Sequence, residues 1–132
     1  MFLHVDPANG LAIYDQIARG IKFAIADGAL ASGELAPSVR ELARDLTINP
    51  NTVARAYRQL QDDQVLEAVR GRGLAVARGA AQRCRKERLA LIESRLTQVI
   101  GEARVSGLED TELRRLIEAA LAAVPGREGG KG

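Results

Sequence analysis

"TINPNTVARAYRQL", residues Thr47–Leu60, contains both the start and the inward face of one predicted helix. Asn49 is a suitable N-cap, because its side-chain oxygen can accept a hydrogen bond from an N–H group of the first turn. Pro50 then occupies the first helical position, where its missing N–H costs nothing. At about 100° per residue, the apolar side chains fall on one narrow stripe, which consists of Val53, Ala56, Tyr57 and Leu60.

The opposite face of this helix is polar. Asn51, Arg55 and Arg58 fall within a sector of about 60° on the side away from the apolar stripe. A solvated surface is the ordinary interpretation of such a face on an amphipathic helix. A binding surface is the alternative, and the neighbouring elements decide between the two.

A first helix is expected well before this stretch. Isoleucine recurs every fourth residue from Ile13 to Ile25, which predicts a helix over about residues 11–27 that stops at Gly28. The segment "FLHV", residues 2–5, is expected to form a short strand ahead of this helix.

A short second helix is expected directly before the quoted stretch. Ser38 is its predicted N-cap, and its inward face consists of Val39, Leu42, Ala43 and Leu46. Only Thr47 and Ile48 separate this helix from the Asn49 cap. Two helices joined by so short a turn, the second with a free polar face, have the spacing of a helix-turn-helix.

A β-hairpin is expected to follow. "VLEAV" and "LAVA" predict two strands, and the "RGRG" between them predicts a tight turn, because Gly71 and Gly73 can adopt positive φ. Arg70 and Arg72 then lie at the tip. A solvated turn would explain "RGRG" taken alone. Directly after a helix-turn-helix, arginines on a projecting hairpin favour a wing that contacts a phosphate backbone or a minor groove.

Composition and charge agree with one modest core and a polyanionic partner. The chain has 132 residues, of which 46% are hydrophobic, and a formal net charge of +2. Residues 38–88 hold eleven basic and six acidic residues, so the excess of positive charge lies around the predicted helix-turn-helix and hairpin. A single cysteine, no long apolar run and no signal-peptide pattern lead us to expect a cytoplasmic protein that is not attached to a membrane.

The C-terminal third carries two apolar stripes. One follows alternating spacings of three and four, a heptad-like seam that consists of Leu89, Ile92, Leu96, Val99 and Ala103. The other consists of Leu113, Leu116, Ile117, Ala120, Leu121 and Val124. The short link "VSGLED" predicts a helical hairpin, with Ser106, Glu109 and Asp110 as alternative caps of its second helix. Because two helices alone bury such stripes poorly, pairing with a second copy of the chain is expected.

Several motifs in order resemble those of the GntR family of transcription regulators, over about residues 2–78. The family pattern has Tyr-x-Gln-Ile in the first helix, Pro-Ser-x-Arg-x-Leu-Ala at the second, Thr-Val early in the third and Gly-x-Gly in the wing. The matching residues are Tyr14, Gln16, Ile17, Pro37, Ser38, Arg40, Leu42, Ala43, Thr52, Val53, Gly71 and Gly73. "NPNTVARAY" and the short helical tail are most similar to the YtrA-type subfamily.

Among the departures from the family pattern, two bear on the inter-helix turn and on base reading. Thr47 stands where many relatives have glycine, so the turn either is not left-handed there or carries strain. Ala54 stands where other branches often have an arginine that contacts DNA. Base reading is therefore expected to shift to Asn51, Arg55 and Arg58.

The sequence and the resemblance together predict a mainly α (α+β) protein. Residues 1–78 are expected to form a winged helix-turn-helix that binds DNA, residues 79–125 a two-helix dimerisation domain, and residues 126–132 a disordered tail. The candidate DNA-binding residues are Ser38, Arg40, Asn49, Asn51, Thr52, Arg55, Arg58, Arg70, Gly71 and Arg72. The candidate dimerisation residues are Leu89, Ile92, Leu96, Val99, Leu113, Leu116, Ile117 and Leu121.

Each group of DNA-binding candidates has an expected role. The third helix is expected in the major groove, with Asn51 on adenine and Arg55 or Arg58 on guanine or phosphate. Ser38 and the N-terminus of the second helix are expected to bind a phosphate, to which Arg40 adds charge. The expected partners are a pseudo-palindromic double-stranded operator and a second copy of the chain, and the resemblance implies repression of a transporter operon. A small-molecule effector stays open.

Other chemistries have little support. His4 and Cys84 are the only imidazole and thiol, and they lie far apart in the sequence, so we expect no metal site, no cofactor and no enzyme. Cys84 is interpreted as core packing, although the neighbouring Arg83, Arg85 and Lys86 could lower its pKa and make it redox-sensitive. The alternative function, from another class, is a winged helix that serves as a protein-interaction module.

Overall fold

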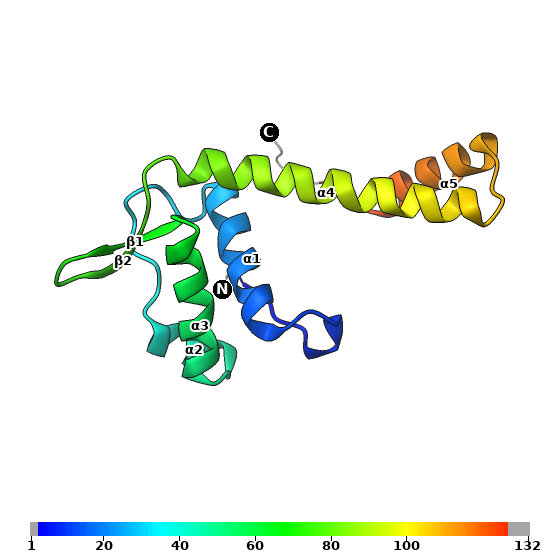
Figure 1. The fold of residues 1–132 in the computed structure, drawn as a ribbon. Helices are drawn as coiled ribbons and strands as arrows, with labels where there is room; N and C mark the ends of the chain where they lie inside the picture. The colour runs from blue at the N-terminus through cyan, green and yellow to red at the C-terminus, as the bar shows by residue number, and fades with distance from the viewer. Residues whose placement is uncertain (1–2, 127–132) are drawn as a thin grey trace. The chain divides into compact units, whose positions relative to one another are not determined.

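The computed structural model describes residues 3–126. In chain order its elements are the short 3₁₀ helix η1 (Pro7–Asn9), α1 (Ile13–Asp27), α2 (Val39–Leu46), α3 (Pro50–Asp62), β1 (Leu66–Val69), β2 (Gly73–Val76), α4 (Ala80–Val105) and α5 (Asp110–Ala123) (Figure 1). The chain forms two compact units, one up to Ala90 and one from Leu91. We call them the winged-helix unit and the C-terminal hairpin.

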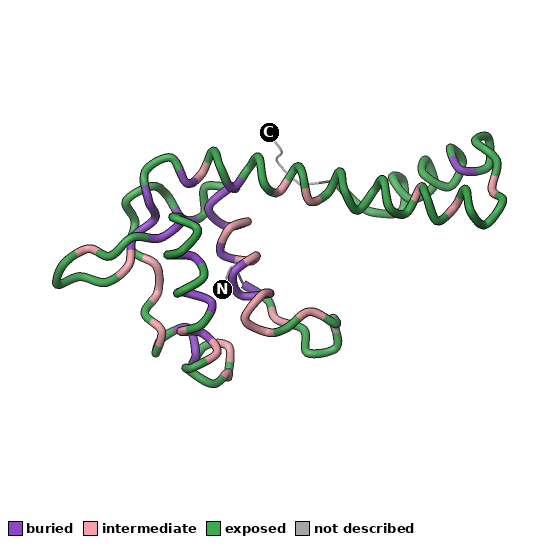
Figure 2. Tube along the Cα trace, viewed as in Figure 1, coloured by how far each residue is buried: buried purple, intermediate pink, exposed green. Residues whose placement is uncertain are grey.

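The core of the winged-helix unit lies between α1, α2 and α3. Ile17, Ile21 and Ile25 of α1 are completely buried, as are Leu42 of α2 and Leu60 of α3. The buried positions recur along one side of each helix, while the other side stays exposed (Figure 2). The apolar stripes predicted for the three helices are therefore confirmed. The first helix stops before Gly28, as predicted, and Gly28 caps it in a left-handed conformation.

The predicted helix-turn-helix is confirmed in its details. The Asn49 side chain accepts a hydrogen bond from the N–H of Asn51, and Pro50 is the first residue of α3. Thr47 ends α2 with φ 56° and ψ 53°, in the left-handed region. For a β-branched residue this conformation costs about 1–2 kcal/mol. Of the two alternatives for the missing glycine, strain is therefore the one that the structure supports.

The predicted hairpin is confirmed as an antiparallel pair of strands. Leu66 pairs with Val76 and Val69 with Gly73, so the turn consists of residues 70–72. Gly71 (φ 74°) and Gly73 (φ 125°) adopt the positive φ that the sequence predicted. An isolated bridge joins Leu35 to Ala75 and adds a third extended segment beside β2.

The strand expected at residues 2–5 is wrong for the described part of that segment, which has no regular structure from Leu3 to Asp6. Instead of pairing with a strand, its backbone is bound by the amide of Gln16 on α1. Gln16 Oε1 accepts from the N–H of Asp6 at 2.8 Å, and Nε2 donates to the Asp6 carbonyl at 2.9 Å. Leu3 is buried against Gly20, where a Cβ atom would lie 1.8 Å from Leu3 Cδ1.

The first turns of α4 belong to the winged-helix unit. Ala80 and Cys84 are buried in its core. Lys22 of α1 forms ion pairs with Glu87 of α4 (2.8 Å) and with Asp63 (3.1 Å). The compact unit therefore extends to Ala90, beyond the boundary predicted after residue 78. The helical pattern of α4 could not show this, because the contacts that decide it come from α1.

The C-terminal hairpin consists of α4 from Leu91 onward and α5. Gly107 (φ 91°) allows the turn between the two helices, which confirms the predicted fold-back. Glu109 is the N-cap residue of α5, but its side chain makes no capping hydrogen bond. The Ser106 hydroxyl instead donates to the carbonyl of Glu102. Of the tail predicted to be disordered at 126–132, residues 127–132 lie outside the described part.

Candidate nucleic-acid interface

The polar face of α3 is exposed along its length. Asn51, Arg55 and Arg58 are all exposed, whereas Val53 and Leu60 on the opposite side are completely buried. Within residues 3–126, no salt bridge involves either arginine. Their positive charge is therefore not neutralised by a carboxylate of the described chain, so it is available to an anionic partner.

Two further DNA-binding candidates, at the start of α3, make contacts within the fold. The Asn49 side-chain oxygen accepts from the N–H of Asn51 at 2.8 Å, and Thr52 is half-buried. The N–H of Thr52 donates to the Asn49 carbonyl. These residues set the position of the first turn, while Asn51 presents its side chain to solvent.

Arg55 has a neighbour that the sequence did not reveal. Its Cζ atom lies 3.9 Å from the centre of the Tyr14 ring, within the range of a cation–π interaction. Tyr14 is half-buried at the start of α1 and packs against the core. The contact joins two separate helices, so neither the periodicity of α1 nor that of α3 could indicate it.

The predicted phosphate site at Ser38 is partly occupied by the protein itself. Ser38 Oγ accepts from the N–H of Glu41 at 3.1 Å, and Glu41 Oε1 accepts from the N–H of Ser38 at 3.0 Å. These hydrogen bonds to Ser38 lower the pKa of Glu41, and nearby Arg44 lowers it further. The capping box thus uses the Ser38 N–H group and places a carboxylate at the helix start. Arg40 is exposed beside it.

The segment before α2 is tied to α3 by Tyr57. The buried phenol donates a 2.6 Å hydrogen bond to the carbonyl of Pro37. Burial raises the pKa of Tyr57, and the charge of Glu41 raises it further, so the hydroxyl keeps its proton and remains a donor. This hydrogen bond fixes the start of α2 relative to α3.

The wing presents its arginines to solvent. Arg70, Gly71 and Arg72 are all exposed, and the N–H of Arg72 donates to the Val69 carbonyl at 2.9 Å to close the turn. No salt bridge in the described chain involves either arginine. Arg40 at the start of α2 likewise forms no salt bridge within residues 3–126, so among these residues the winged-helix unit carries unpaired positive charge on α3, at the start of α2 and on the wing.

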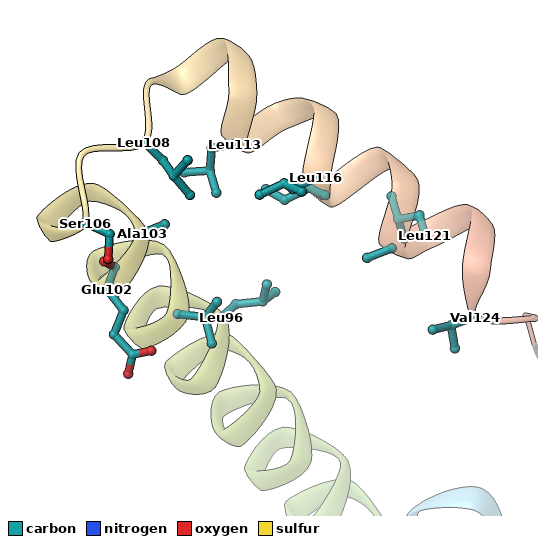
Figure 3. Close-up of a pocket in the computed structure, with 12 residues that line it drawn as sticks. Leu96, Glu102, Ala103, Ser106, Leu108, Leu113, Leu116, Leu121 and Val124 are labelled. Carbon is teal, nitrogen blue, oxygen red and sulfur yellow. The ribbon is translucent and has the colours of Figure 1, made fainter.

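Seven of the eight dimerisation candidates lie on exposed apolar surface. An open groove of about 740 Å³ lies between α4 and α5 within the C-terminal hairpin (Figure 3). Six of the eight predicted residues line it, namely Leu96, Val99, Leu113, Leu116, Ile117 and Leu121. Leu89 and Ile92 do not line the groove but are also exposed. Of the six, Leu113 is buried and the others are exposed.

Cys84 and His4 differ in burial. Cys84 is buried, and burial raises the pKa of its thiol, so the basic neighbours do not activate it as the sequence had left open. His4 is exposed. Among the described residues no cluster of metal-ligating side chains occurs, and none of their helices is long and apolar enough to span a membrane.

Comparison with known proteins decides the family. Residues 13–76, which run from α1 to β2, match the family model of bacterial regulatory proteins of the gntR family. The chain is 34% identical to the HTH-type transcriptional repressor YtrA of Bacillus subtilis, over 94% of this chain and 95% of that protein. The chain belongs to the GntR family. It is a transcription regulator with a DNA-binding winged helix, and its family and relatives are regulators rather than enzymes.

Solved structures of transcription regulators have the same fold. A transcriptional regulator from Oenococcus oeni superposes with a TM-score of 0.70 at 29% identity, over 88% of this chain and 99% of that one. YtrA from Sulfolobus acidocaldarius, a GntR-family transcription factor, gives a TM-score of 0.58 at 33% identity, over 74% of this chain and 99% of that one. Because the matched lengths include the C-terminal helices, the resemblance to the YtrA type extends beyond the winged helix.

Proposed function

We propose that the chain is a repressor that binds a pseudo-palindromic DNA operator as a homodimer. The observation that carries this proposal is the set of exposed arginines on α3 and the wing, none of which is paired with a carboxylate in the described chain. Repression is suggested by the name of the Bacillus subtilis relative. The family resemblance further suggests a transporter operon as the target, and a chromosomal operator would place the protein in the cytoplasm.

The roles of the side chains follow from their chemistry. On α3 in the major groove, Asn51 can form two hydrogen bonds with adenine, and Arg55 or Arg58 can do so with guanine or contact phosphate. Arg70 and Arg72 on the wing hold the backbone or enter the minor groove. At α2, the capping box leaves the hydroxyl hydrogen of Ser38 and the guanidinium of Arg40 for a phosphate.

The groove of the C-terminal hairpin supports the homodimer. Leu96, Leu116 and Leu121 are each more than half exposed on its walls. An exposed apolar surface of this kind on a short hairpin is typical of a protein–protein interface. A second copy that inserts its own leucines would bury both surfaces at once and would place two α3 helices on one operator, with half-sites about 10 bp apart.

A salt titration of DNA binding tests this proposal against the protein-interaction module. The promoter of the regulator's own gene would first be searched for a short inverted repeat, and DNA that carries this repeat would be compared with a shuffled sequence. Each phosphate neutralised by Lys or Arg contributes about −0.9 to the slope of log K against log[salt]. A steep negative slope with preference for the repeat supports the repressor. A shallow slope without preference would favour the protein-interaction module.

Substitutions on α3 and on the wing distinguish residues that read bases from residues that hold the DNA backbone. Arg55→Ala or Asn51→Ala is expected to cost about 1–3 kcal/mol on the best operator and to relax the preference at particular base pairs. Arg72→Ala is expected to weaken binding to all DNA sequences similarly and to reduce the magnitude of the slope of log K against log[salt] by about one. If Arg72→Ala changed base preference while Arg55→Ala did not, the assigned roles of helix and wing would be reversed.

A further inference from the structure

The stacking of Arg55 on Tyr14 fixes an otherwise mobile side chain on the exposed face of α3. The guanidinium carbon lies 3.9 Å from the ring centre. Arg55 is exposed and forms no salt bridge within residues 3–126, so among these residues the ring is the one partner that the structure gives its charged group. By contrast, Arg58 on the same face has no aromatic ring beneath it in the described chain.

The ring itself is held in place by the fold. Tyr14 and its neighbour Ile13 pack against the hydrophobic core at the start of α1. Two residues further on, the buried amide of Gln16 donates hydrogen bonds to the carbonyls of Asp6 and Leu11, at 2.9 and 3.0 Å. These contacts anchor the first turn of α1, so the ring is a fixed platform rather than a second mobile side chain.

Stacking of this kind leaves the useful part of the guanidinium free. The N–H groups of arginine lie in the plane of the guanidinium, whereas the ring covers one of its faces. The edge that would form two hydrogen bonds with guanine, or contact a phosphate, therefore remains available. A free arginine loses side-chain freedom when it binds, and a side chain already ordered by the ring loses less of it.

We propose that Tyr14 is a positioning residue for DNA recognition, which orders Arg55 on α3 before the DNA arrives. The proposal rests on the proposed function, in which Arg55 contacts the operator. It assigns to α1 a part in recognition through the ring of Tyr14, without contact between that ring and the DNA.

A double-substitution cycle on the full chain tests the coupling. Operator affinity is measured for Tyr14→Leu, Tyr14→Phe, Arg55→Ala and the combination of Tyr14→Leu with Arg55→Ala. Loss of the ring is expected to weaken operator binding about two- to fivefold, the strength of an exposed cation–π contact. Tyr14→Phe keeps the ring and is expected to retain the affinity. In the Arg55→Ala background, Tyr14→Leu is expected to have no further effect.

Arg58→Ala provides the matched control, because Arg58 lies on the same face without a ring. In that background Tyr14→Leu is expected to keep its full effect. A general loss of stability would weaken binding in every background, and urea unfolding of each variant measures that loss separately.

Three results would overturn the positioning role. Tyr14→Leu could weaken binding equally with and without Arg55, which would indicate a purely structural role. It could strengthen binding, which would mean that the ring withholds Arg55 from DNA. Tyr14→Phe could lose as much operator affinity as Tyr14→Leu, which would indicate that the tyrosine hydroxyl contacts the DNA directly. If Arg55→Ala itself left operator affinity unchanged, the proposed role of Arg55 on DNA would fail first.

Discussion

The winged-helix unit and the C-terminal hairpin both carry regular apolar stripes, but only the first covers them. Leu42 of α2 is completely buried, whereas Leu121 of α5 is 67% exposed. The difference lies in the number of elements that pack together. Three helices and a hairpin close around one core, whereas two antiparallel helices leave a groove between them. A stripe in the sequence therefore predicts that a face will be buried, but not whether the chain itself supplies the cover.

Truncation of a leucine should have different consequences in the two regions. Leu42→Ala is expected to lower the free energy of unfolding by about 2–5 kcal/mol, because it leaves a cavity in a closed core. Its effect on the melting temperature should not depend on protein concentration. Leu121→Ala should lower the melting temperature of the C-terminal hairpin by an amount that does depend on concentration, because its cover comes from a second copy. Calorimetry over a hundredfold range of protein concentration measures both shifts in melting temperature. If the two shifts depended on concentration in the same way, the two regions would not differ in how their leucines are covered.

A charge placed in the groove should separate assembly from folding. Leu96→Glu is expected to cost several kcal/mol of dimerisation free energy, because the carboxylate would be buried at the interface without a partner. The circular dichroism of the winged-helix unit should be unchanged. Gln98→Glu adds the same charge at an exposed position about 200° further around α4 and serves as the control. Sedimentation measures the oligomeric state of both variants. If the Leu96→Glu protein were dimeric, the groove would be excluded as the dimer interface.

Relief of strain should stabilise the winged-helix unit alone. Thr47→Gly is expected to raise its free energy of unfolding by about 1 kcal/mol, since glycine adopts the left-handed region without a Cβ clash. Thr47→Ala retains a Cβ atom and should gain much less. Urea unfolding compares the three proteins. A gain from alanine as large as that from glycine would show that the threonine atoms beyond Cβ, rather than the Cβ atom in the left-handed backbone, are the source of the cost.

Removal of the Glu41 carboxylate from the capping box of α2 should change stability least, and the size of this change should depend on pH. The hydrogen bonds from Ser38 hold the pKa of Glu41 below its ordinary value of 4.5. Its contribution to stability is therefore present above 4.5 and is lost as the pH falls through the lower pKa of the folded protein. Glu41→Gln should make the loss of stability between about pH 5 and about pH 3 shallower. Glu67→Gln, an exposed carboxylate of β1 without these hydrogen bonds, serves as the control.

Local signals in the sequence were sufficient for the winged helix. The Asn49 cap, the stripe from Val53 to Leu60 and the glycines of the wing each act over a few residues, and all occur as predicted. The strand predicted at residues 2–5 was wrong for the described part of that segment, because contacts with a later helix determine its conformation. The segment after Leu3 binds to Gln16 of α1 rather than to another strand.

At the candidate interface, too, local patterns predicted exposure but not contacts between separate helices. The exposure of Asn51, Arg55 and Arg58 follows from helical periodicity and was predicted correctly. The ring under Arg55 comes from α1, and the ion pairs of Lys22 join α1 to α4. Neither contact has a signal in the spacing of residues along one helix, because each depends on how two helices pack. Whether these residues bind DNA stays a prediction.

In the proposed function, the winged-helix unit makes the contacts with DNA, and the C-terminal hairpin gives specific affinity by joining two such units on one operator. The decisive experiment compares the full chain with a chain cut after Ala90, because that cut keeps Ala80 and Cys84 in the core, whereas a cut after Arg78 would remove them. The full chain should sediment as a dimer and bind the inverted repeat tightly. The shortened chain should be a folded monomer whose affinity falls toward the non-specific level, since one module buries only about 600–1,000 Å² on DNA. A shortened chain that binds the repeat as tightly as the full protein would contradict the claim.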